Sequence, residues 1–149
     1  DEEPDTPVGF LVDKKGRALI KQEFSLLKEG LKRLRAIYFS GGNSPVPPES
    51  YGVLNEIGTL MLKYPSLKIQ IEGHTDSAGD KAFNMKLARD RARNVLEHLL
   101  KHFPELSRDR FRVVGFGSDK PVASNQTFQG RKANRRVEFI IINQNSLFK

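Results

Sequence analysis

The fold of this chain is decided by residues 67–102, LKIQIEGHTDSAGDKAFNMKLARDRARNVLEHLLKH. In the first part of this stretch, apolar and polar residues alternate up to Gly73, which is the pattern of a half-buried β-strand. A helix is predicted to start near Asp80 and to continue to about His102, because Pro104 lies just beyond it. The stretch therefore predicts a strand followed closely by a long helix.

The predicted helix carries an apolar stripe with polar residues at its edge. At about 100° per residue, one side of the helix collects Ala88, Ala92, Val95 and Leu99. Asn84 and Arg91 lie at the edge of this stripe, two helical turns apart. Arg91 needs an anion or contact with water, because burying an unpaired charge costs several kcal/mol. An internal salt bridge, a side chain that reaches solvent, and a bidentate clamp for a ligand carboxylate all remain open.

A second charged residue, Asp76, lies between the strand and the helix. It follows the strand end, where open α/β sheets bind ligands, although the residues at 77–79 also suit a turn or a helix cap. A fixed carboxylate opposite a fixed guanidinium suits a zwitterion, which has an ammonium and a carboxylate on one carbon. Asp76 and Arg91 are therefore the first candidates for a binding site. For His74, we expect a structural hydrogen bond rather than a role in metal binding or acid–base chemistry.

The same patterns predict further elements on both sides of this stretch. They are an amphipathic helix at 18–36, a strand at 36–39, a loop of turn formers at 40–45, a helix at about 48–64, a strand at 111–116, a polar loop at 117–130 and a strand at 137–142. The alternation of strands and helices favours an α/β (α+β) class, with a mixed sheet that has its helices on one face.

The domain organisation follows from the same patterns. A length of 149 residues fits one compact domain. We expect a flexible acidic N-terminal arm at 1–17, an additional amphipathic helix at 18–36, the binding domain at 37–143 and a short C-terminal tail at 144–149.

The composition is basic and free of cysteine. The net charge is +7, and it rises to +11 when the four acids among residues 1–5 are left out. Such a surface favours polyanions or carboxylate-rich partners, including nucleic acid, anionic membranes and cell-wall polymers. The absence of cysteine excludes disulfides and thiolate metal sites, and three histidines make a conventional zinc site improbable, so we expect no metal and no cofactor. No apolar run approaches the roughly 20 residues of a spanning helix.

Four cations lie close together in the segment GRKANRR at 130–136. The simplest interpretation is a solvated face, and the alternatives are contacts with nucleic-acid phosphates or with a ligand carboxylate. A basic nucleic-acid-binding domain that uses Arg131, Lys132, Arg135 and Arg136 is the alternative function. It is disfavoured because no aromatic platform is interleaved with these cations and because Asp76 would repel phosphate.

Several short motifs at fixed spacing carry a family resemblance. They are IEGHTD at 71–76, Gly79, Asn84, Leu87, Arg91-Ala92, Val95, GFG at 115–117, Pro121, Asn125, Gly130-Arg131 and NRRVE at 134–138. At these intervals the chain resembles the OmpA-like peptidoglycan-binding domain over roughly residues 37–142. This module is shared by OmpA C-terminal regions, peptidoglycan-associated lipoproteins and flagellar stator proteins, and which of these parents applies here stays open.

The resemblance implies a βαβαββ fold that binds the peptide stem of peptidoglycan noncovalently and is not an enzyme. It implies that Asp76 and Arg91 hold the zwitterionic diaminopimelate end of the stem. Further ligand-binding residues implied by the matched motif and by the loop after the first strand are Asn84, Arg135, Thr75, Ser40 and Gly41. Many relatives have an acid where this chain has Ser40. The implied location is periplasmic and outer-membrane-associated, in a bacterium with a Gram-negative-type wall, with the domain anchoring an envelope protein.

Overall fold

The computed structural model describes residues 36–143 of the chain. The expected arm at 1–17, the additional helix at 18–36 except for its last residue, and the tail at 144–149 lie outside the described residues. The elements in chain order are β1 (Ile37–Tyr38), η1 (Pro48–Ser50), α2 (Tyr51–Lys63), β2 (Ile69–His74), α3 (Lys81–His102), η2 (Arg108–Arg110), β3 (Phe111–Gly117), α4 (Phe128–Asn134) and β4 (Arg136–Ile141). Within this part of the chain, no helix combines the length and the apolar character that crossing a membrane requires.

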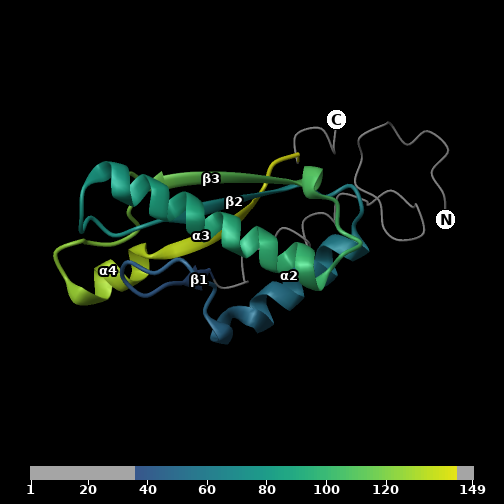
Figure 1. The fold of residues 1–149 in the computed structure, drawn as a ribbon, viewed down its shortest axis with the longest axis horizontal. Helices are drawn as coiled ribbons and strands as arrows, with labels where there is room; N and C mark the ends of the chain where they lie inside the picture. Colours follow the sequence, from purple (N-terminus) through teal and green to yellow (C-terminus); the bar gives the residue numbers. More distant parts are fainter. Residues whose placement is uncertain (1–35, 144–149) are drawn as a thin grey trace.

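The strands form one four-stranded sheet in the order β1-β4-β2-β3. β2 runs parallel to β3 and antiparallel to β4, while β1 pairs with β4 in the antiparallel sense. A parallel pair needs a crossover connection, and α3 supplies it between β2 and β3. Figure 1 shows α3 running along both of these strands. The expected mixed sheet of an α+β domain is confirmed.

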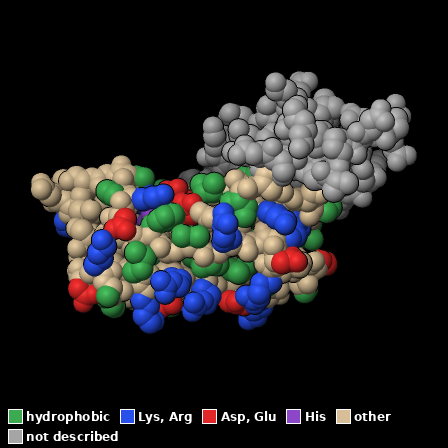
Figure 2. All heavy atoms as spheres, turned by 90° about the horizontal axis from the view of Figure 1, so that it is seen from above, with side chains coloured by type: hydrophobic (Ala, Val, Ile, Leu, Met, Phe, Trp, Pro, Cys, Tyr) green, Lys and Arg blue, Asp and Glu red, His purple; other side chains and the backbone are tan. Residues whose placement is uncertain are grey.

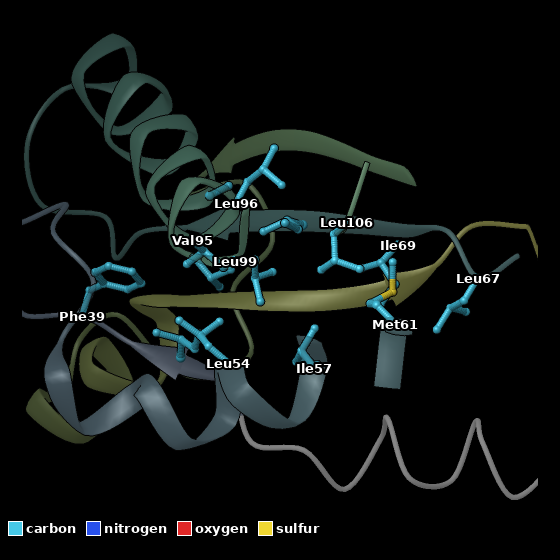
Figure 3. Packing of buried hydrophobic residues seen from close by; sticks show 14 residues of the cluster. Phe39, Leu54, Ile57, Met61, Leu67, Ile69, Val95, Leu96, Leu99 and Leu106 are labelled. Carbon is cyan, nitrogen blue, oxygen red and sulfur yellow. The ribbon is translucent and has the colours of Figure 1, made fainter. Parts of the chain in front are cut away.

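The hydrophobic core lies between the sheet and the two longer helices. Leu54 and Ile57 of α2, Ile69 of β2, and Val95 and Leu99 of α3 are all 0% exposed and belong to one apolar cluster. Figure 3 shows these side chains directed into the same space between the helices and the strands. Both helices therefore cover one face of the sheet, as expected from the sequence.

Two glycines allow α3 to approach the sheet closely near the ends of β2 and β3. A Cβ atom on Gly73 would lie 1.8 Å from the carbonyl oxygen of Ala88. On β3, a Cβ atom on Gly115 would lie 2.8 Å from the backbone nitrogen of Arg89. A side chain at either position would push the helix away from the sheet. The close approach is what brings the next turn of α3, with Arg91, to the end of β2.

The segment at 117–130, predicted as a polar loop, ends in the short helix α4. The helix begins after Thr127, whose side-chain oxygen accepts a hydrogen bond from the N–H of Gly130 at 2.9 Å. At its other end, the buried carboxamide of Asn134 accepts hydrogen bonds from the backbone N–H groups at 122–123. A seven-residue helix with two cations and a glycine has no apolar stripe, so periodicity does not distinguish it from a loop.

Candidate functional site

Arg91 is fully buried, with 0% of its surface exposed, and it is held by main-chain carbonyl groups rather than by an acid. Its Nε donates to the carbonyl of Asn43 at 2.8 Å, its Nη1 to that of His74 at 3.1 Å and its Nη2 to that of Ser40 at 2.8 Å. The guanidinium also lies 5.1 Å from the centre of the Phe39 ring. No ion pair joins Arg91 to a carboxylate within the described part of the chain. The structure therefore contradicts both an internal salt bridge and a side chain that reaches solvent.

The environment of Arg91 favours the approach of an anion. Burial lowers the pKa of Arg91 to about 10, while the nearby charge of Asp76 acts in the opposite direction, so the guanidinium is protonated at neutral pH. Its three hydrogen bonds engage three of the five N–H groups that a guanidinium offers. A buried cation without an acid in contact attracts anions strongly, because little solvent screens its charge.

Asp76 forms a turn and an ion pair at the same time. Its Oδ1 accepts a hydrogen bond from the N–H of Ala78 at 3.0 Å, which confirms the predicted turn role. Its Oδ2 pairs with Nη1 of Arg135 at 3.0 Å, and the two side chains are 12% and 14% exposed. The hydroxyl of Thr75 donates to the main-chain carbonyl of Asp76 at 2.8 Å and thereby fixes the backbone at the strand end. The ion pair is thus preformed and still reached by solvent.

The loop after β1 is tied to α3 through its main chain. The carbonyls of Ser40 and Asn43 accept hydrogen bonds from Arg91, and the carbonyl of Ser44 accepts one from Nδ2 of Asn94 at 2.8 Å. Ser40 and Gly41 are both exposed. The expected rim of the site is therefore a loop whose backbone lies over the buried arginine.

Asn84 lies on the first turn of α3 and is 2% exposed. No hydrogen bond of its carboxamide is found within residues 36–143, so its polar atoms remain free for a ligand. Arg91 lies near the Asp76–Arg135 pair, because the charges of both residues act on its pKa and Phe39 contacts both arginines. Asp76, Arg91 and Arg135 are called the charged group below. Neither a hydrogen bond nor an ion pair joins Asn84 or Gly41 to that group in the part of the chain that the structure describes.

The basic segment at 130–136 is largely engaged inside the molecule, which corrects the expectation of a solvated face. Arg135 pairs with Asp76, and Arg136 is 4% exposed and pairs with Glu138. In the view of Figure 2, acidic side chains are scattered among the Lys and Arg side chains instead of leaving one continuous basic patch. Two of the four cations are therefore already neutralised by acids of the protein, which weakens the nucleic-acid alternative.

A pocket of about 500 Å³ opens next to the ion pair, between the loop after β1 and α4. It is lined by Tyr38, Phe39, Ser40, Pro47, Glu49, Gln129, Lys132, Ala133 and Arg135. Arg135 of the charged group lines the pocket, and so does Ser40, whose carbonyl binds Arg91. Most of the other lining residues were not predicted, because they come together only when β1 and α4 meet across the end of the sheet.

The structure corrects one further expectation and shows contacts that the sequence did not reveal. His74 does not make the expected hydrogen bond, since neither ring nitrogen has a partner among the described residues and Nε2 lies 3.6 Å from Oε1 of Glu72. Its contribution to the site is the carbonyl that accepts from Arg91. The carbonyls of Asn43 and Phe39 likewise hold the two arginines. Main-chain acceptors leave no signal in side-chain identity, so no sequence pattern identifies them.

The chain has relatives among proteins of known sequence and structure. It is 35% identical over 138 residues to outer membrane porin F of Pseudomonas aeruginosa, covering 93% of this chain and 37% of the porin. It is 33% identical over 105 residues to the peptidoglycan-binding protein ArfA of Mycobacterium tuberculosis, covering 70% of this chain and 32% of that protein. The chain spans about a third of the length of the curated relatives that it matches first.

A solved structure shows the same fold. The peptidoglycan-associated lipoprotein from Burkholderia pseudomallei superposes with a TM-score of 0.68 at 25% identity, covering 72% of this chain and 90% of the lipoprotein chain. The OmpA family matches residues 38–135, a range that runs from the last residue of β1 through α4 and holds every residue of the charged group. The chain therefore belongs to the OmpA family.

Proposed function

We propose that this chain binds the peptide stem of peptidoglycan noncovalently and anchors an envelope protein to the cell wall. The observation that carries the proposal is the group of one carboxylate, Asp76, and two guanidiniums, Arg135 and Arg91, of which Arg91 is fully buried and has no acid partner among the described residues. The family is structural and non-enzymatic, so binding without bond cleavage is the expected activity.

The charged group suits the zwitterionic end of a diaminopimelate residue. The ligand ammonium takes the place of Arg135 on the carboxylate of Asp76. The ligand carboxylate then binds Arg135, whose Nη2 makes no hydrogen bond within the described residues, and it faces the charge of Arg91. Before binding, the three groups carry a net charge of one positive unit, which a ligand carboxylate compensates. Charge-assisted hydrogen bonds of this kind contribute about 1.5–3 kcal/mol each.

The surroundings of the charged group provide room for the rest of the stem. The 500 Å³ pocket continues from Arg135 and Ser40, so the residues of the stem next to diaminopimelate lie there. Gly41 forms the exposed rim beside Ser40, and the free carboxamide of Asn84 supplies polar contacts at the start of α3. Thr75 acts by fixing the backbone that carries Asp76.

The relatives support the same activity and a location in the cell envelope. ArfA of Mycobacterium tuberculosis is called a peptidoglycan-binding protein, and the Burkholderia structure is that of a peptidoglycan-associated lipoprotein. Porin F is an outer membrane protein. We infer a periplasmic, outer-membrane-associated location in a Gram-negative-type bacterium, with the wall as the partner. We expect roughly micromolar affinity for one stem, and many stems on one polymer raise the avidity.

The experiment is co-sedimentation with purified sacculi that contain diaminopimelate, at low and at physiological salt. The parent protein should sediment at both, and Asp76→Ala should remain in the supernatant. Asp119→Ala is the matched control, because Asp119 is a half-exposed acid that lies outside the charged group. Free diaminopimelate should release the parent protein, whereas Nα-acetyl-lysine amide, whose only charged group is the terminal ammonium, should not. Equal sedimentation of both variants, with release by salt alone, would mean that only general charge attraction holds the protein on the wall.

A further inference from the structure

A separate cluster of possible metal ligands lies on the face of the sheet opposite the helices. Glu72 of β2 and Glu138 of β4 are direct cross-strand partners, so two carboxylates stand opposite each other on one face. Like charges in such a pair destabilise a sheet unless a cation compensates them. His74 follows two residues after Glu72 along β2 and therefore points to the same side of the strand.

His74 is the unusual member of this cluster. It is 1% exposed, and neither Nδ1 nor Nε2 has a hydrogen-bond partner among the described residues. Nε2 lies 3.6 Å from Oε1 of Glu72, which is too long for a hydrogen bond. A buried imidazole whose nitrogens have no hydrogen-bond partner among the described residues offers a ligand atom to a metal ion.

We propose that Glu72, His74 and Glu138 bind a divalent transition-metal ion of the zinc type. One ligand atom from each residue lies within 4.8 Å of the other two. Bonds of about 2.0–2.2 Å in a tetrahedral zinc site place the ligand atoms roughly 3.4 Å apart, so the 3.6 Å between His74 and Glu72 already fits. The remaining ligand atoms are at most 4.8 Å apart, so they must approach by no more than about 1.4 Å to reach this spacing, and a water molecule takes the fourth position.

Neighbouring side chains hold the two carboxylates in place without using the atoms that the metal needs. Nε2 of Gln70 donates to Oε2 of Glu72 at 2.6 Å, which leaves Oε1 directed at His74. Nε of Arg136 donates to Oε2 of Glu138, which leaves the other oxygen of that carboxylate available. Hydrogen bonds to ligating carboxylates are a regular feature of metal sites. Arg136 and Lys120 place two positive charges near His74, against the two carboxylates of the cluster.

The location of this cluster connects it with the charged group on the other side of β2. The same residue, His74, offers its ring to the metal and its carbonyl to Arg91. A bound ion would join β2 to β4 beneath that carbonyl, and it would stabilise the folded chain in proportion to its affinity. The metal site nevertheless stands on its own residues, so it does not depend on the peptidoglycan-binding proposal.

The experiment needs a reference protein in which His74 is the only histidine. The chain has three histidines, and the rings of His98 and His102 lie 4.2 Å apart, one helical turn apart on α3, where such a pair binds transition metals by itself. The reference is therefore the His98→Gln, His102→Gln double variant without an affinity tag. Calorimetry with Zn²⁺ should give one site per chain. The ring nitrogens of His74 should shift in ¹⁵N NMR spectra as Zn²⁺ is added.

Three substitutions in this reference test the ligands. Glu72→Gln and Glu138→Gln should each weaken Zn²⁺ binding at least about tenfold, because each replaces a ligating carboxylate by an uncharged carboxamide of nearly the same size. Glu97→Gln is the matched control, since it removes an exposed glutamate that also pairs with an arginine, and it should leave the affinity unchanged. The absence of saturable Zn²⁺ binding in the reference, unchanged His74 resonances, or equal affinities of the Glu138→Gln and Glu97→Gln variants would overturn the proposal. Because the NMR measurement uses the reference itself, it remains decisive even if a variant fails to fold.

Discussion

Replacing the buried arginine should destabilise the fold before any ligand is involved. In Arg91→Met the side chain keeps its approximate length and apolar stem but loses every N–H donor. The carbonyls of Ser40, Asn43 and His74 then lose the hydrogen bonds that join the loop after β1 to the end of β2. The substitution also removes a buried charge, and the relief of its desolvation offsets part of the loss.

The size of the effect follows from these opposing contributions. Hydrogen bonds from a charged donor contribute about 1.5–3 kcal/mol each, and three are lost at once. Removing a buried charge returns several kcal/mol of desolvation energy. We expect a net decrease of at least about 2 kcal/mol in the free energy of unfolding, which is a large share of the stability of an ordinary domain.

The assay is urea denaturation followed by circular dichroism, with Arg89→Met as the matched control. Arg89 lies on the same helix, two residues away, and is exposed, so its replacement should change the free energy of unfolding by no more than about 0.5 kcal/mol. If the two variants unfold at the same urea concentration with the same slope, the inferred role of Arg91 in joining the loop to the strand is wrong. A binding test that uses Arg91→Ala must therefore include a check that the variant folds. Asp76→Ala is the better variant for binding tests, because it removes only a partly exposed ion pair.

Three further changes test other parts of the account. Gly73→Ala should lower the free energy of unfolding by about 3 kcal/mol in urea denaturation, because its Cβ would lie 1.8 Å from the Ala88 oxygen, and an unchanged midpoint would contradict the close approach of α3. Asn134→Ala should lower the free energy of unfolding by about 2–4 kcal/mol in the same assay, since the N–H groups at 122–123 lose their acceptor. A decrease of less than about 1 kcal/mol would contradict the role of Asn134 in holding this loop. In metal-free buffer, stability should fall by up to about 3 kcal/mol as the pH drops from about 6.5 to about 4, because the pKa of His74 is lowered to about 4 and only the unfolded chain binds the proton in that window. In His74→Gln the urea midpoint should depend less on pH between about 4 and 6.5 than in the parent protein. The same dependence in both proteins would contradict the role given to His74.

The periodicity of apolar residues predicted most of the strands and helices of the fold. The strand that ends near Gly73 and the helix that begins after Asp80 lie where the sequence placed them, and Asp80 caps the helix by accepting a hydrogen bond from the N–H of Phe83. The helix α4 was not predicted, because it has no apolar stripe. Thr127 and Asn134 stabilise it through capping and loop contacts instead.

The candidate site was predictable in its charged side chains and not in its main-chain contacts. Helical spacing placed Arg91 beside the core, and the strand end singled out Asp76. Their partners differ from the expectation: Asp76 pairs with Arg135 from a distant part of the chain, and Arg91 binds three carbonyls. Long-range pairings of this kind depend on how β4 is placed in the sheet, which local patterns do not encode.

The most direct test of the central claim compares two muropeptides that differ only at the third residue of the stem. One carries diaminopimelate and the other carries lysine, which lacks the carboxylate beside the terminal ammonium. Isothermal titration calorimetry with the parent protein should give roughly micromolar affinity for the diaminopimelate stem and at least tenfold weaker binding for the lysine stem, while Asp76→Ala should bind both weakly. Equal affinity of the parent protein for the two stems would contradict recognition of a zwitterion by Asp76 and the two arginines.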